Sequence, residues 1–384
     1  MTQSPPLIII GSGLAGYTLA REFRKLDETT PLTIITRDDG GFYSKPMLSN
    51  ALSKGKGAAQ LVTSSADEMG DKLGATIMAH TEVNVIDTVQ HSVSTSQGDI
   101  DYSSLVIACG AVPFRPPMAG DATDEVLSIN NLADYARFRE RLESARRIAI
   151  IGPGLIGCEF ANDLINAGKR VAIIGPDPYP ISTLLPVAVG RALKSALSAQ
   201  GVAWHLGTTA TAVNHNGTGY RITLDSGSEI TADLVISAVG LRPSIALAEA
   251  SGIDVNRGIV TNRLLETSAN DVFALGDCAE VSGMNLFFVA PLMTGARALA
   301  QTLSGEQTAV EYPAMPVVIK TPTCPLVVSP PPRDVTGEWH YEGDAPNITA
   351  RFTAADGVLL GFALSGDAVV QKQALTAVLP PVLR

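Results

Sequence analysis

Two turns in the chain carry glycines at the spacing that binds the phosphates of a dinucleotide. Both read Gly-x-Gly-x-x-Gly, with Gly11, Gly13 and Gly16 in the first copy and Gly152, Gly154 and Gly157 in the second. The first glycine of this motif permits a tight turn, the second lets a pyrophosphate approach the backbone, and the third lets the next helix pack on the preceding strand. Backbone N–H groups at the start of that helix then hold the phosphates, here at Leu14 and Ala15 and at Leu155 and Ile156.

The surroundings of both turns favour nucleotide binding over an empty glycine turn, which the motif alone would not exclude. An apolar run precedes each turn, at residues 7–10 and 147–151. A helix-like segment follows each, at residues 14–26 and 155–167. The copies lie too far apart for a solenoid repeat, so two separate nucleotide-binding units are expected.

The residues after the second strand of each unit indicate which nucleotide binds. An acidic side chain there accepts ribose hydroxyls, and a basic one binds a 2′-phosphate. In the second unit Asp177 follows the apolar run at 171–174, and no lysine or arginine comes before Arg191. Asp177 is therefore the predicted ribose ligand, and NADH is favoured over NADPH.

The corresponding acidic residue of the first unit is Asp38. It follows the run at residues 32–36 one or two positions later than is usual for a ribose ligand. A ribose contact is predicted at Asp38, and a solvated loop charge is the alternative.

The elements that must position these sites follow from the rest of the sequence. Apolar β-branched runs alternate with helix-like segments along the 384 residues, which indicates an α/β fold with parallel sheets covered by helices. Beyond residue 315 the pattern changes to alternating runs at 348–352 and 358–364. These predict antiparallel strands in a small C-terminal α+β domain.

Composition excludes several classes of protein. With 46% apolar and 17% charged residues the chain is not disordered, and a net charge of −10 gives no basic footprint for nucleic acid. It has no signal peptide and no apolar run that would insert into a membrane, so a cytoplasmic protein is expected. Four scattered cysteines without a CxxC motif predict neither a metal site nor a redox-active dithiol.

Two further segments, LVIACG at residues 105–110 and TSANDVFALGD at residues 267–277, complete a family resemblance. Together with both glycine turns they resemble the pyridine nucleotide-disulfide oxidoreductases, flavoproteins whose first turn holds FAD and whose second holds NAD(P)H. The resemblance implies two Rossmann-like domains. Residues 1–114 and 240–315 would bind FAD, residues 115–239 NADH, and residues 316–384 would form the C-terminal domain.

Other segments resemble one branch of that family, the rubredoxin reductases. They are YSKPMLS at 43–49, IGCEFANDL at 156–164, ISAVGLRP at 236–243, RGIV at 257–260, LGDCAEV at 275–281 and KTPTCPLVVSPPPR at 320–333. The resemblance implies that NADH reduces FAD and that the flavin passes single electrons to rubredoxin, which feeds an alkane hydroxylase.

The same resemblance assigns roles to single residues. It implies a Lys45–Glu159 pair that tunes the flavin near N5 and O4, and it places Asp277 beside the ribityl and pyrophosphate part of FAD. It also brings Lys320 to the flavin pyrimidine and the Val83 backbone to the adenine. The alternatives are a lysine and a carboxylate that never meet, a plain turn at Asp277, a surface lysine at position 320 and a simple sheet residue at Val83.

Two other functions remain open at this point. The nearer is a reductase of another one-electron carrier, such as a [2Fe–2S] ferredoxin, which the same three domains also serve. The other is a non-enzymatic FAD and NADH sensor. Because rubredoxins are typically acidic, as this chain is, docking would need a local basic patch, for example near Lys45, Arg115 and Lys320.

Overall fold

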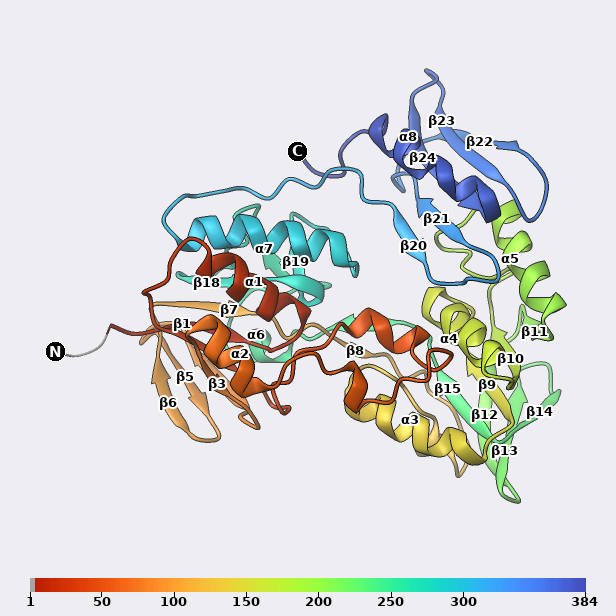
Figure 1. Ribbon diagram of the computed structural model, residues 1–384, viewed down its shortest axis with the longest axis horizontal. Helices are drawn as coiled ribbons and strands as arrows, with labels where there is room; N and C mark the ends of the chain where they lie inside the picture. Colours follow the sequence, from red (N-terminus) through yellow and green to blue (C-terminus); the bar gives the residue numbers. More distant parts are fainter. Residues whose placement is uncertain (1–3) are drawn as a thin grey trace.

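The computed structural model describes residues 4–384 and shows three packed units (Figure 1). The first is built on a five-stranded parallel sheet with the order β18-β7-β1-β2-β3. Its strands are β1 (Leu7–Ile10), β2 (Leu32–Ile35), β3 (Thr76–Met78), β7 (Ser104–Ile107) and β18 (Val272–Ala274). Helices α1 (Leu14–Arg24), α2 (Ala66–Leu73) and α7 (Val289–Leu303) belong to this unit. Strand β18 pairs with β7 and comes from far along the chain, so the unit is discontinuous.

The second unit repeats this plan around a four-stranded parallel sheet with the order β11-β10-β9-β15. Its strands are β9 (Arg147–Ile151), β10 (Arg170–Gly175), β11 (Ala203–Leu206) and β15 (Leu234–Ser237). Its helices are α3 (Leu132–Ser144), α4 (Leu155–Asn166) and α5 (Val187–Ala199), and it adds an antiparallel sheet of β12 (Ala210–Asn216), β13 (Gly219–Leu224) and β14 (Glu229–Ala232). The predicted α/β fold with parallel sheets is confirmed.

The third unit is a five-stranded antiparallel sheet with the order β20-β21-β24-β23-β22. Its elements are β20 (Val317–Ile319), β21 (Leu326–Ser329), β22 (Gly337–Glu342), β23 (Thr349–Ala354), β24 (Leu359–Ser365) and α8 (Lys372–Ala377). Its side chains, among them Leu326 and Ala363, share one buried core with Ile150 and Leu193 of the second unit. The third unit is therefore packed on the second, and the first unit has a core of its own.

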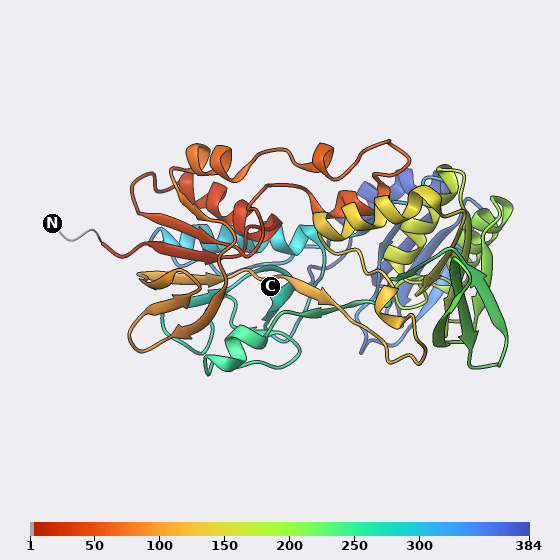
Figure 2. The ribbon, with the colours of Figure 1, turned by 90° about the horizontal axis from the view of Figure 1, so that it is seen from below.

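Short segments link the units. The 3-10 helix η1 (Lys45–Asn50) leaves the first unit and lies against α4, where Leu48 joins the core of the second unit (Figure 1). Strands β8 (Ala111–Pro113) and β16 (Leu241–Pro243) form a two-stranded antiparallel ribbon that joins the first two units (Figure 2).

The first unit also carries smaller elements. They are β4 (Val83–Asp87), β5 (Ser92–Thr95), β6 (Gly98–Asp101), β17 (Ile259–Thr261), β19 (Ala279–Val281), α6 (Ala246–Ala250) and the 3-10 helix η4 (Gly276–Cys278). Near the end of the chain, Leu383 returns to this unit and bridges to Tyr312. Within residues 4–384 no helix is both long enough and apolar enough to cross a membrane.

Candidate functional site

The first glycine turn joins β1 to α1 and leaves a cradle at the start of the helix. Gly11 has a φ of +118°, and a Cβ there would collide with the carbonyl oxygen of Ala108. A Cβ at Gly16 would collide with the carbonyl oxygen of Gly11, which is why α1 packs so closely on the turn. At Gly13 a Cβ would meet no atom within 4 Å, and no side chain caps the helix. The free N–H groups of the first turn therefore face room for a phosphate.

The second turn, between β9 and α4, has the same mechanics. Gly152 has a φ of +113°, and a Cβ there would lie 2.5 Å from the carbonyl oxygen of Ala238. Gly157 is held against the carbonyl of Gly152, whereas a Cβ at Gly154 would face open space, and α4 also begins without a side-chain cap. Both turns thus fit the pyrophosphate of a dinucleotide.

Asp38 lies beside the first turn. Its Oδ1 accepts hydrogen bonds from Ser12 Oγ at 3.1 Å, Thr36 Oγ1 at 2.6 Å and the Gly40 N–H at 3.1 Å. Ser12 belongs to the glycine turn itself, so these bonds tie the carboxylate to it. Asp38 is exposed, and its Oδ2 makes no hydrogen bond within residues 4–384. That oxygen can accept ribose hydroxyls despite the late position of Asp38 in the sequence.

Asp177 occupies the equivalent place in the second unit. It lies two residues after β10 and is half-buried, and its Oδ1 accepts a hydrogen bond from the hydroxyl of Ser182. The N–H of Ile181 bonds to the carbonyl of Pro153 at 2.9 Å, which fastens the loop carrying Asp177 to the second glycine turn. A carboxylate held here suits a ribose better than a 2′-phosphate.

Lys45 and Asp277 lie together beside the first turn. Gly276 presses on α1, since a Cβ there would lie 2.9 Å from the Cβ of Ala15, and this places Asp277 next to the cradle. Burial lowers the pKa of Lys45, and the charge of Asp277 opposes that shift. Burial raises the pKa of Asp277, and the charge of Lys45 opposes it. The two half-buried groups therefore feel each other's charge.

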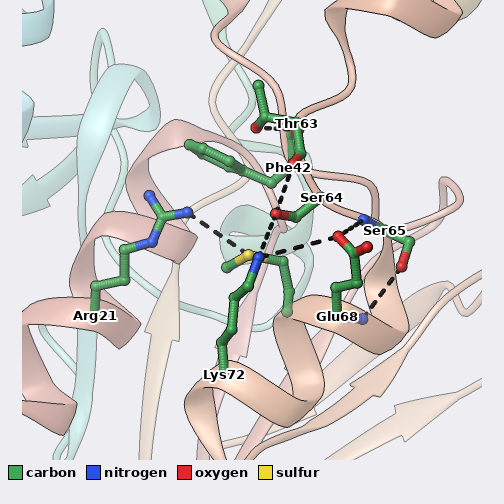
Figure 3. A network of polar contacts seen from close by, with 8 residues as sticks. Arg21, Phe42, Thr63, Ser64, Ser65, Glu68 and Lys72 are labelled. Carbon is green, nitrogen blue, oxygen red and sulfur yellow. Dashed lines mark hydrogen bonds and ion pairs between the residues drawn. The ribbon is translucent and has the colours of Figure 1, made fainter.

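Lys45 lies in the segment between Phe42 and Ser64, and the network in Figure 3 holds the two ends of this segment together. The backbones of Phe42 and Ser64 form an antiparallel β-bridge, and the guanidinium of Arg21 lies 4.0 Å from the centre of the Phe42 ring. Lys72 donates a hydrogen bond to Ser64 Oγ at 2.9 Å, and a capping box starts α2 at Ser65. These contacts hold both ends of the segment on the first unit.

Glu159 on α4 is the meeting point of three segments. The residue is 1% exposed, and its carboxylate accepts hydrogen bonds from Ser49 Oγ at 2.6 Å, Lys320 N–H at 2.8 Å and Lys320 Nζ at 2.6 Å. Among the described residues Glu159 pairs with Lys320 and no ion pair joins it to Lys45, so the Lys45–Glu159 tuning pair stays a prediction for the flavin-bound protein. The helix η1 brings Ser49 to α4, and Asp277 is among the charges that act on the pKa of Lys45.

Comparison with known proteins identifies the family. The sequence pattern of the pyridine nucleotide-disulphide oxidoreductases matches residues 5–303, and that of a rubredoxin binding C-terminal domain matches residues 309–379. The chain belongs to the pyridine nucleotide-disulphide oxidoreductase family. The cofactors of this family, FAD and a nicotinamide nucleotide, are those that the two cradles fit.

Relatives named rubredoxin-NAD(+) reductase cover nearly the whole chain. The Alcanivorax borkumensis protein is 46% identical over 98% of this chain and 99% of its own length. The Acinetobacter baylyi protein is 44% identical over 98% of this chain and 98% of its own length. In the solved covalent complex of putidaredoxin reductase with putidaredoxin, the matching chain has a TM-score of 0.89 at 24% identity, covering 99% of this chain and 94% of that one. The predicted resemblance to rubredoxin reductases is confirmed.

The contacts of the individual site residues with the two nucleotides stay predictions, among them those of Val83 and Lys320. Val83 begins β4 and is half-buried, and the nearby Thr81 N–H bonds to the carbonyl of Thr36 at 2.9 Å, so Val83 lies near the end of β2. That position suits an adenine contact and a plain sheet residue equally. Lys320 stands on the third unit and reaches Glu159, and its predicted flavin contact is untested.

Three residues of this site were missed by the sequence reasoning. They are Ser49, Asn162 and Asp163, which join η1 and the loop after β20 to α4. The sequence could have indicated them, because polar residues recur at positions 159, 162 and 163, on one side of a helix that is otherwise mostly apolar. The start of α7 was also missed. Leu292 in its first turn lies next to Gly276, and the helix begins without a side-chain cap.

A surface hollow of about 1140 Å³ lies away from these residues. It is lined by α2, β6 and the amino ends of β2 and β3, whereas both glycine turns lie at the carboxyl ends of their sheets. Ligands of open α/β sheets bind at the carboxyl ends, so the glycine turns define the site.

Proposed function

We propose that the chain is an NADH-dependent reductase of rubredoxin. The observation that carries the proposal is the match of residues 309–379 to a rubredoxin binding domain, because it adds an acceptor to the two nucleotide cradles. Relatives at 44% and 46% identity, matched over nearly their full length, bear the name of this activity. A dithiol relay is not part of the proposal, since the sequence has no CxxC or CxxxxC cysteine pair.

The residues divide the work between two nucleotides. The first turn and Asp38 would bind the pyrophosphate and ribose of FAD, with Asp277 beside its ribityl chain. The second turn and Asp177 would bind NADH. The bound flavin supplies the redox chemistry, accepting a hydride from NADH and releasing electrons one at a time. Lys45 and Lys320 would place positive charge where the reduced ring becomes negative.

The division of the chain into functional domains is part of this proposal. Residues 1–114 and 240–315 would bind FAD, residues 115–239 NADH, and residues 316–384 would face rubredoxin. The shared core of the second and third units supports a rubredoxin-facing domain that is rigidly attached to the NADH domain. Lys320 links that domain to Glu159, which lies on the helix after the NADH turn.

The cellular compartment and the protein that receives electrons from rubredoxin also belong to the proposal. We place the protein in the cytoplasm, where four free thiols persist in their reduced form. An alkane hydroxylase as the protein that rubredoxin feeds stays a prediction. A [2Fe–2S] ferredoxin is the competing carrier, and the rubredoxin binding domain favours rubredoxin over it.

Reduction of a panel of purified carriers by NADH tests the proposal. Rubredoxins and [2Fe–2S] ferredoxins are compared at fixed ionic strength, since charged docking depends on salt. We expect at least one rubredoxin to exceed every ferredoxin in kcat/KM. A ferredoxin that outperforms all the rubredoxins would reassign the acceptor, and no reduction of any carrier would favour a sensor.

A further inference from the structure

Helix α4 carries three buried polar side chains on one face. Glu159, Asn162 and Asp163 are 1%, 0% and 4% exposed. Residues three and four apart lie on the same side of a helix, so the three form one polar strip. The rest of the buried face is apolar, with Phe160, Ala161 and Leu164 in the core. Buried polar groups on such a helix are costly unless each is bonded.

Asp163 binds the segment that follows Lys45. Its Oδ2 accepts a hydrogen bond from the N–H of Leu52 at 2.8 Å, and its Oδ1 accepts one from the N–H of Ser53 at 3.0 Å. No cation pairs with this carboxylate within residues 4–384. Both oxygens are thus committed to two consecutive backbone donors on a segment of the other nucleotide unit.

The rest of the strip binds the segment that carries Lys320. Asn162 Oδ1 accepts a hydrogen bond from the N–H of Thr323 at 3.1 Å, and Glu159 accepts one from the N–H of Lys320 at 2.8 Å. A single helix therefore holds the backbone of both segments that carry a predicted flavin lysine. The same helix begins at the second glycine turn.

The connection from Asp163 to Lys45 is short and stiff. The helix η1 runs from Lys45 to Asn50, and only Ala51 separates it from Leu52. After η1, the N–H of Gly55 donates to the carbonyl of Leu52 at 2.9 Å, and the N–H of Lys56 donates to the carbonyl of Ala51 at 3.0 Å. The amides of Leu52 and Ser53 thus anchor the carboxyl end of η1, as does the bond from Ser49 to Glu159, and loss of the Asp163 anchor would give η1 and Lys45 more freedom.

We propose that Asp163 is a positioning residue that fixes Lys45 beside bound FAD by holding the Leu52 and Ser53 amides. The proposal rests on the proposed function, since it takes Lys45 to act on the flavin. Asn at position 163 offers only one acceptor oxygen, and its NH₂ group would face the second backbone N–H. Asp163→Asn should therefore release one end of the segment and loosen Lys45.

Asp233 provides a matched control. Its Oδ2 also accepts hydrogen bonds from two consecutive backbone N–H groups, of Arg146 at 3.0 Å and Arg147 at 2.8 Å. It lies between β14 and β15, away from η1. Its other oxygen, Oδ1, accepts a hydrogen bond from the Arg147 guanidinium at 2.6 Å. Asp233→Asn therefore weakens a carboxylate that also anchors two backbone amides, without touching the Lys45 segment.

The test uses the full-length FAD-bound protein and no rubredoxin, so its result is independent of the acceptor. Hydrogen exchange at Leu52 and Ser53, the flavin midpoint potential and stopped-flow reduction by NADH are measured. Asp163→Asn should speed exchange at both amides, shift the potential in the direction given by Lys45→Met, and slow flavin reduction by roughly tenfold. The dissociation constant of NADH should stay within about twofold, as uniform binding is not removed.

A double variant separates positioning from general loosening. In a Lys45→Met background, Asp163→Asn should change the potential no further, because both substitutions act through the same ammonium. Faster exchange with an unchanged potential would overturn the proposal, and so would a full additional shift in the double variant or an equal effect of Asp233→Asn. If Asp163→Asn fails to fold, Asp163→Glu, which keeps the charge and moves the oxygens, must shift the potential or the proposal is rejected.

Discussion

Replacing Glu159 by glutamine tests the junction of the three segments. The carboxylate is fully buried and binds the Lys320 ammonium, the Lys320 N–H and the Ser49 hydroxyl. Glutamine has nearly the same size but keeps one acceptor oxygen. Its NH₂ group would face the ammonium or the hydroxyl, so at least one of the three contacts is lost.

The expected loss follows from the burial of the two partners. Removing one member of a fully buried ion pair costs about 3–5 kcal/mol, because the other charge is left unpaired. The Lys320 side chain is 27% exposed, and water there relieves part of this cost. We therefore expect Glu159→Gln to lower the free energy of unfolding by about 2–3 kcal/mol.

A double-mutant cycle with Lys320→Met measures the pair itself. Urea unfolding of the FAD-bound protein gives the free energy for both single variants and for the double variant. The double variant should lose about 1–2 kcal/mol less than the sum of the single losses. Losses that add within about 0.5 kcal/mol would show that the two charges do not interact and would refute the reasoning.

Two further predictions concern the NADH turn and the buried lysine. Gly154→Val should leave the fold intact, because its Cβ meets open space, yet raise the KM for NADH by at least roughly tenfold with FAD retained; an unchanged KM would argue against a pyrophosphate at this turn. Burial lowers the pKa of Lys45 below its unfolded value of about 10.4, so the unfolded chain binds more protons in the interval between the two. The free energy of unfolding of the apoprotein should thus rise as the pH increases toward the unfolded pKa of Lys45. Lys45→Met should remove this rise. Urea midpoints of the two proteins that change in parallel between pH 8 and 10 would contradict the prediction.

Local sequence rules sufficed for the parts of the fold made by neighbouring residues. Strand, glycine turn and helix follow one another within 20 residues in both units, and β1 and β9 have the predicted bounds. Helix α1 was expected to reach residue 26 but ends at Arg24, where the chain turns at Lys25. Asp38 lies beside the first turn because two hydroxyls donate hydrogen bonds to it, those of Thr36, two residues earlier, and of Ser12 in the turn itself.

Contacts between distant segments escaped prediction. Lys320 lies 161 residues from Glu159, and nothing local indicates that the third unit brings it there. The bonds from Asp163 to the Leu52 and Ser53 amides depend on how η1 crosses between units. The shared core of the second and third units likewise depends on the packing of two sheets that the sequence shows only separately.

Stopped-flow absorbance of the FAD-bound protein tests the central claim most directly, because it follows electrons into and out of the flavin in one experiment. NADH should bleach the flavin band, and oxidised rubredoxin added to the bleached protein should restore it as rubredoxin itself is reduced. A flavin that NADH leaves oxidised, or that stays bleached when rubredoxin is added, would contradict the account.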